Sequence, residues 1–366
     1  MGVPRTPPKS SPTNKTTTLQ TLFDLESNSP TTTATISSNS QTQELLSIIS
    51  YCTSVFSFAD PSESPYQQDL KRLKLSHLLA SLKSSKPPLA LDDRILSPLF
   101  SVIAADLLRP LPPCTTNLLV PADSAALLDD DDDPLSSYLS PAWPHLHLVY
   151  DILLRLVLHS DPNSLRPHVD RPFLLALLSL FQTEDRRERE CLKNVFHRIY
   201  SRFTFHRSFM RKAMKDVFLQ HVFDAGAADC RHPGIGELLE VWGSIINGFG
   251  VPLREEHKVF LTKVLLPMHK CKGMQAYHRQ LAYCVSQFLQ KEPMLGVVVV
   301  RGILKHWPIT NCQREVLLLG ELEELVDYMD QAQYAKLASP LCSQVSKCLN
   351  SWNSQVKLAR ALDDNF

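Results

Sequence analysis

The chain has 366 residues, enough for one large domain, two ordinary domains or one elongated repeat array. Its 38 Lys and Arg residues balance 38 Asp and Glu residues, so net charge gives no overall field that favours nucleic acid or a membrane surface. Only 11 Gly are present, Leu is the most frequent apolar residue, and no apolar run reaches the roughly 20 residues that span a bilayer. These features favour an all-helical soluble protein without a membrane span.

Residues 1–42 are rich in Ser, Thr and Pro, and this composition predicts a disordered tail. The first residues lack the hydrophobic core of a secretory signal. The nine Cys are scattered without a C-x-x-C pair, and Cys191, Cys284 and Cys342 fall on apolar helix positions. We therefore expect reduced, buried thiols in a cytoplasmic or nuclear protein.

A helical pattern occupies residues 43–362, ahead of a short end at 363–366. Apolar residues recur there at three- and four-residue spacing, in segments of roughly 12 to 18 residues joined by short turns. A helix pair recurs about every 40 residues, which is the period of HEAT-type repeats. There is no alternation of strands and helices, so we predict an all-α array of HEAT-like helical repeats.

The predicted helices follow one another in chain order, with one long interruption. They lie at 43–58, 69–83, 95–111, 145–160, 171–181, 187–203, from 207, around 241–245, and at 256–270, 277–290, 294–308, 314–329, 334–350 and 354–362. A loop at about 111–141 contains Pro, Thr and Asp without a sustained period. Its run Asp129–Asp133 is interpreted as a solvated acidic loop, because adjacent carboxylates need a turn and Gly to converge on one cation.

Motifs for catalysis and metal binding are missing from the sequence. No P-loop, G-x-S-x-G or H-E-x-x-H motif is present. Cys230 and His232 lack two further partners at ligand spacing, so no metal site and no cofactor are predicted. Glu321, Glu323 and Glu324 are interpreted as the solvated face of an amphipathic helix. A non-catalytic protein is therefore favoured over an enzyme.

The candidate site lies between residues 187 and 257, where two stripes share one helix. Lys193, His197 and Tyr200 recur at i, i+4 and i+7, beside an apolar face that is expected to be buried. That apolar face consists of Leu192, Val195, Phe196, Ile199 and Phe203. A cationic, hydrogen-bonding row therefore stands next to a core row.

Two further helices complete the predicted groove. Arg207 opens the next helix, and Val241 and Ile245 lie one turn apart on a third. Stacked together, the three helices predict an apolar floor with basic walls, which suits an extended peptide with two apolar anchors and an acidic end. The plainer alternative is a solvated helix surface beside an ordinary core. Clustering of the cations, together with His197 and Tyr200, argues against that alternative.

Several long fragments occur in the order of one protein family: AWPHLHLVYDILLRLV, LFQTEDRRERECLKNVFHRIY, ELLEVWGSIINGFGVPLREEHKVFL, HRQLAYCVSQFLQKEP and GELEELVDYMD. They resemble the B-prime regulatory subunits of protein phosphatase 2A, from about Tyr51 to about Leu362. The Ser/Thr-rich tail resembles that of plant members. The resemblance implies a curved right-handed solenoid that is not an enzyme, docks on the scaffold (A) and catalytic (C) subunits, and selects substrates.

In that family a concave groove binds L-x-x-I-x-E motifs of substrate proteins. Carried over by motif, the resemblance assigns this groove to Lys193, His197, Arg198, Tyr200, Arg207, Val241, Ile245, Arg254 and His257. The two aliphatic residues are expected to hold the apolar anchors of the motif. The cations are expected to meet its Glu, and any phosphate, through charge-assisted hydrogen bonds.

The resemblance also raises expectations about the two ends of the chain. The sequence stops at Phe366, where family members continue through further repeats, so a C-terminally truncated form that assembles poorly with the catalytic subunit is expected. The alternative is a helical adaptor that binds acidic peptides without a phosphatase. In a further hypothesis, Leu19, Leu22 and Asp24 form a degenerate motif that occupies the groove in cis.

Overall fold

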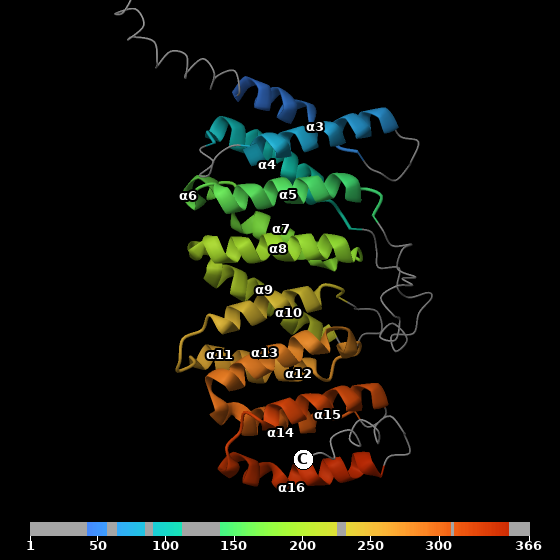
Figure 1. Cartoon of the computed structure of the whole chain (residues 1–366), viewed down its shortest axis with the longest axis vertical. Coiled ribbons are helices and arrows are strands. Elements are labelled where there is room, and N and C mark those ends of the chain that lie inside the picture. The colour runs from blue at the N-terminus through green and yellow to red at the C-terminus, as the bar shows by residue number, and fades with distance from the viewer. Residues whose placement is uncertain are drawn as a thin grey trace, which may run out of the picture.

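A computed structural model describes residues 42–56, 64–84, 91–111, 140–224, 232–308 and 311–350. These residues form α-helices joined by short turns, and no β-strand occurs among them. The helices stack along one long axis, from the helix at 42–51 to α16 (Gln331–Leu349) (Figure 1). The predicted all-α fold of stacked helical repeats is confirmed.

The stack has two layers, and helices of one layer contact one another in chain order. The front layer of Figure 1 contains α3 (Pro65–Ser84), α5 (Trp143–His159), α8 (Arg186–Arg202), α10 (Ile235–Asn247), α13 (His278–Lys291) and α15 (Cys312–Val326). The rear layer contains α4 (Asp93–Leu107), α7 (Arg171–Ser179), α9 (Arg207–Asp224), α11 (Glu255–Phe260), η4 (Leu261–Leu265), α12 (Leu266–Met268), α14 (Gly296–Lys305) and α16. Each repeat therefore supplies one helix to each layer.

Short elements turn the chain between the layers. They are α6 (Pro162–Leu165), η2 (Leu180–Gln182), η3 (Thr204–His206), η5 (Met274–Tyr277) and η6 (Pro293–Leu295). Pro162 and Pro293 stand in the first turns of two of them, where a missing backbone N–H costs no helical hydrogen bond.

The core is one continuous seam between the layers. Buried apolar side chains form a single cluster that runs from Ile48 to Leu341. The predicted apolar face of α8 belongs to it: Leu192, Val195, Phe196, Ile199 and Phe203 are all 0 or 1% exposed. Each helix buries its apolar face only against its neighbours, as repeat proteins do.

One predicted helix has a local irregularity that periodicity did not indicate. The segment 256–270 forms α11 and α12 with a π-helical turn, η4, between them. Pro267 has no N–H to donate to the carbonyl of Lys263, and Leu266 instead donates to Leu261, five residues earlier. The wider turn keeps the chain helical across the proline.

The interpretation of Glu321 as a solvated residue is wrong. Its side chain is 1% exposed and lies between His269 Nε2 at 3.1 Å and His278 Nε2 at 2.8 Å. Burial opposes the charged carboxylate, but these two imidazoles hold the pKa of Glu321 at about 2. Glu323 and Glu324 are exposed, as expected. One carboxylate therefore links α15 to α13 and to the residue after α12.

The burial of the thiols agrees only in part with the expectation. Cys284 is buried, but Cys191 is half-buried and Cys342 is exposed, so the prediction of a buried thiol is wrong for Cys342. All Cys residues in the described segments are free thiols. Across the same segments no helix is long and apolar enough to cross a membrane.

Other predictions fall outside the described residues. These are the tail up to residue 41, most of the loop at 111–141 with Asp129–Asp133, the helix at 354–362, Cys230, and the tail residues Leu19, Leu22 and Asp24.

Candidate functional site

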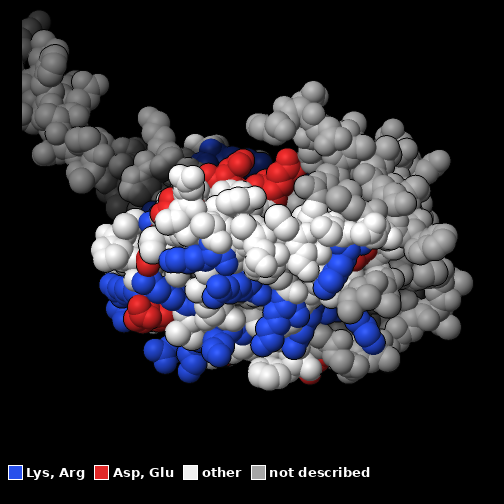
Figure 2. All heavy atoms as spheres, turned by 90° about the horizontal axis from the view of Figure 1, so that it is seen from below, with Lys and Arg blue, Asp and Glu red and all other residues white. Residues whose placement is uncertain are grey.

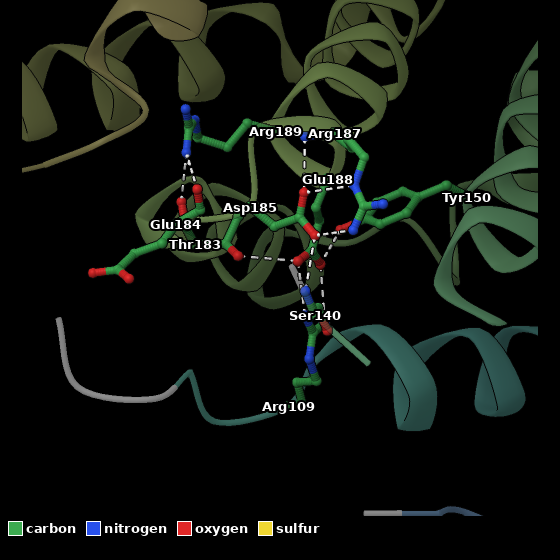
Figure 3. Close-up of polar contacts among 9 residues, drawn as sticks. All are labelled: Arg109, Ser140, Tyr150, Thr183, Glu184, Asp185, Arg187, Glu188 and Arg189. Carbon is green, nitrogen blue, oxygen red and sulfur yellow. Dashed lines mark hydrogen bonds and ion pairs between the residues drawn. The ribbon is translucent and has the colours of Figure 1, made fainter. Parts of the chain in front are cut away.

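Helix α8 positions the candidate site, and its first turn is fixed by a buried polar network (Figure 3). The carboxylate of Glu188 is fully buried. Arg109, which follows α4, donates to both of its oxygens at 2.9 and 2.7 Å. The hydroxyls of Tyr150 and Thr183 each donate to it at 3.0 Å. Four donors thus hold one charge, and α8 is locked to α5 and to the chain after α4.

Asp185 caps the same end of α8. Its carboxylate accepts hydrogen bonds from the backbone N–H groups of Arg187 and Ser140, and from the Arg187 guanidinium. Burial opposes the charge, but these hydrogen bonds hold the pKa of Asp185 below its usual range. Arg189 extends the network to α10 through a 2.7 Å ion pair with Glu237. The start of α8 is therefore rigid and internally neutralised.

A pocket of about 310 Å³ opens at the other end of α8. Three helices and the turn after α10 line it: His197, Tyr200 and Ser201 from α8, Arg207 and Arg211 from α9, Ser244 and Ile245 from α10, and Gly248 and Phe249 from the turn. The aliphatic and aromatic carbons of Ile245 and Phe249 give it an apolar wall. Hydroxyl, imidazole and guanidinium groups give it a polar one.

Two arginines dominate the charge of this pocket. Arg207 donates to the backbone oxygens of Tyr200 and Ser201 at 3.0 and 2.7 Å, and its guanidinium lies 5.5 Å from the centre of the Tyr200 ring. Arg211 donates to the Tyr200 hydroxyl at 3.0 Å. Neither arginine forms an ion pair with a carboxylate of the described residues. Both guanidinium groups therefore keep their charge available for an anionic ligand.

His257 backs the pocket through Phe249. The two rings stack with centroids 3.7 Å apart and planes 2° from parallel. The buried Nδ1 of His257 has no hydrogen-bond partner among the described residues. The stacked imidazole ring of His257 fixes the position of Phe249. Its Nδ1 is a hydrogen-bonding group that no described residue uses.

Both histidines of the site have a lowered pKa, which favours the neutral imidazole. Burial and the charges of Arg198 and Lys193 lower the pKa of His197. Burial lowers the pKa of His257 as well, opposed by Glu256 and assisted by Arg211 and Arg254. A bound carboxylate or phosphate would favour the protonated form of both rings.

Comparison with known proteins identifies the group to which this chain belongs. The family model of the protein phosphatase 2A regulatory B subunit (B56 family) matches residues 29–363, which is nearly the whole chain. The chain belongs to the B56 family. This membership confirms the resemblance that the sequence fragments indicated.

The B56-family relatives include several plant proteins, in agreement with the expected plant character. The B' kappa isoform of the 57 kDa regulatory subunit of protein phosphatase 2A from Arabidopsis thaliana is 42% identical over 318 residues, which cover 85% of this chain and 60% of the relative. The B' epsilon isoform of the same plant is 43% identical, covering 83% and 60%. The B' kappa isoform of Oryza sativa subsp. japonica is 40% identical, covering 87% and 60%. The chain thus spans about three-fifths of these relatives, which are named as regulatory subunits.

The pocket of this B56-family chain gathers part of the predicted site. Of the nine residues assigned from the resemblance, the pocket is lined by His197, Tyr200, Arg207 and Ile245. His257 adjoins it through the stacked Phe249.

The remaining predicted residues lie outside the pocket lining. Lys193 is held by Glu190 at 2.7 Å and by Glu240 at 2.5 Å. Arg198 is exposed, and the Arg254 side chain is 78% exposed with Glu256 at 3.7 Å. Val241 is only 2% exposed and belongs to the core. A role in ligand binding stays a prediction for these four, as it does for the five residues at or beside the pocket.

Sequence reasoning missed several residues of the pocket. Arg211 follows Arg207 by one helical turn, so the spacing could have placed both on one face. Ser201, Ser244 and Phe249 carried no such signal, because small polar and single aromatic residues are common on any helix surface. A metal does not fit this set of donors, and no group of three potential metal ligands occurs among the described residues.

Proposed function

We propose that this chain is a substrate-selecting regulatory subunit of a protein phosphatase 2A holoenzyme. On this proposal it docks on the scaffold and catalytic subunits and binds short L-x-x-I-x-E-type motifs of substrate proteins. Membership of the B56 family and relatives named as regulatory subunits support the regulatory role. The pocket at the end of α8 supports the peptide-binding role.

The observation that carries the peptide proposal is the pairing of an apolar wall with two unpaired guanidinium groups. Ile245 and Phe249 suit an aliphatic anchor, and about 310 Å³ is within the size range of small binding sites. Arg207 and Arg211 suit a carboxylate or phosphate next to that anchor, because guanidinium groups bind such planar or tetrahedral anions through paired hydrogen bonds. An acidic motif with aliphatic residues combines both requirements.

The peptide proposal is tested by titrating a labelled L-x-x-I-x-E peptide against the wild type and His197→Ala. Loss of a hydrogen-bonding group at the pocket should weaken binding about tenfold. His147→Ala is the matched control, because His147 is exposed on α5, its ring lies against Trp143, and it does not line the pocket. Equal affinity of the wild type and His197→Ala would remove His197 from the site.

The regulatory proposal has a separate test. Pull-down with the scaffold subunit and the catalytic subunit, separately and together, measures assembly. Formation of a trimer supports the regulatory role. Peptide binding without any co-purifying phosphatase activity favours the alternative, a helical adaptor for acidic peptides.

A further inference from the structure

Charge is balanced over the whole chain but strongly segregated along it. Between Glu256 and Glu315 the sequence holds nine Lys or Arg residues and one acid, Glu292. The following sixteen residues, 315–330, hold six acids and no Lys or Arg. Viewed from the α16 end of the stack, Lys and Arg gather over the lower half of the surface, and the largest groups of Asp and Glu lie along the upper edge (Figure 2). The lower half corresponds to the rear layer of Figure 1.

Two neighbouring helical segments of the rear layer bring basic residues together. Segment α11–η4–α12 contacts α14, and a Cβ on Gly302 of α14 would lie 2.6 Å from the Leu266 side chain of α12. The missing side chain at Gly302 therefore lets the two segments approach closely. Lys263 lies one turn before Leu266, and Arg301 adjoins Gly302.

We call the outward surface of these segments the basic face, and define it by Val259, Lys263, Val298, Arg301 and Lys305. All five side chains are exposed, including the two valines at 45 and 47%. The three residues of α14 recur at i, i+3 and i+7, so they share one side of that helix. None of the three cations forms an ion pair with an acid of the described residues.

We propose that the basic face docks on an anionic membrane surface. Unpaired cations are attracted to acidic lipid headgroups, and exposed aliphatic side chains between them can enter the boundary between headgroups and acyl chains. None of the five residues lines the pocket at the end of α8. Two helices side by side offer a broad face, whereas an extended acidic peptide needs a groove. The apolar members of the face are aliphatic, which favours lipid over the stacked bases of a nucleic acid.

The test is co-sedimentation of the full chain with vesicles of phosphatidylcholine alone and with added phosphatidylserine. Binding should require phosphatidylserine and should decrease at high salt. Each cation near an anionic surface contributes a factor of roughly five to partitioning, so Lys263→Gln/Arg301→Gln/Lys305→Gln should lower it about a hundredfold. Val298→Ser should lower it to a smaller extent, because that change removes insertion and leaves the charge.

The matched control is Lys83→Gln/Arg94→Gln/Arg186→Gln, which removes the same charge from exposed positions on α3, α4 and α8. It should retain wild-type binding, and circular dichroism should show that both triple variants are folded. Equal loss in the two triple variants, or no binding to phosphatidylserine vesicles at low salt, overturns the proposal. Binding to polyglutamate or to an oligonucleotide, but not to vesicles, overturns it in favour of an acidic macromolecule.

Discussion

The two ends of α8 use charge in opposite ways. At its start, Glu188 and Asp185 are buried and surrounded by donors from α5, the chain after α4 and α8 itself. At its end, Arg207 and Arg211 face a pocket and have no carboxylate partner among the described residues. A charge neutralised inside the protein fixes the positions of helices, and a charge left open stays available to a ligand. The support of the site therefore lies at the start of α8, and the open charges lie beyond its end, on α9.

The largest expected effect comes from removing the buried charge of Glu188 at the start of α8. In Glu188→Ala, the Arg109 guanidinium and two hydroxyls lose their acceptor, so the free energy of unfolding should fall by about 3–5 kcal/mol. Chemical denaturation measures this change. Glu190→Ala is the control, because Glu190 is exposed and should cost less than about 1 kcal/mol. Similar small losses in both variants would show that the network does not support α8.

Removing an open charge should act on binding instead of folding. Arg211→Gln keeps a donor near the Tyr200 hydroxyl but removes the cation, so the Kd for an acidic peptide should rise about tenfold to a hundredfold. The free energy of unfolding should change by no more than about 0.5 kcal/mol. Calorimetric titration and denaturation measure the two quantities. Arg186→Gln, at an exposed position at the start of α8, should change neither.

Acidification should distinguish the two ends without a mutation. Because the pKa values of His197 and His257 are lowered in the folded chain, the unfolded chain binds more protons, and the free protein should lose stability as pH falls below about 6.5. An anionic peptide favours the protonated rings, so its affinity should rise several-fold between about pH 7.5 and 5.5. Asp185, whose pKa is lowered, loses its contribution only as pH falls below about 3.8.

The control for this pH dependence is the double variant His197→Gln/His257→Gln. Its peptide affinity should vary much less over the same pH range. An unchanged pH dependence in that variant would assign the titration to the peptide or to other groups.

The smallest effect is expected at Lys193, which lies between the two ends. Its ammonium group is already held by Glu190 and Glu240, so Lys193→Gln should raise the Kd of an acidic peptide less than about threefold. Fluorescence anisotropy can resolve this change. A loss as large as that of Arg211→Gln would mean that the ammonium group leaves its carboxylate partners to meet the ligand.

Local periodicity predicted the fold well and the polar contacts poorly. The apolar stripe of α8 could be predicted because Leu192 and Ile199 follow the helical period. Both residues are buried, as that period indicates. The pairing of Glu321 with His269 and His278 was not readable, because the partners lie 52 and 43 residues away. An isolated Glu on an amphipathic helix looks solvated until the neighbouring repeats are stacked on it.

In the candidate site too, neighbours along the chain could be predicted and contacts between distant residues could not. His197 and Tyr200 share a stripe on α8, and Arg207 opens the next helix, so their proximity could be predicted. The neutralisation of Lys193 by Glu240 could not, because 47 residues separate them. The charge segregation that defines the basic face was present in the sequence, but total net charge conceals it.

The hydrogen bonds of Arg207 to the end of α8 limit how the pocket can diversify. The same guanidinium caps two helix carbonyls and lines the pocket, so a substitution there changes both the end of α8 and the pocket wall. Ser201 and Ser244 do not connect two helices in this way, since their hydroxyls donate to carbonyls of their own helices. On the proposed peptide-binding role, duplicated copies of such a chain could therefore acquire new peptide preferences most freely at these two serines, and library design for altered specificity should begin there.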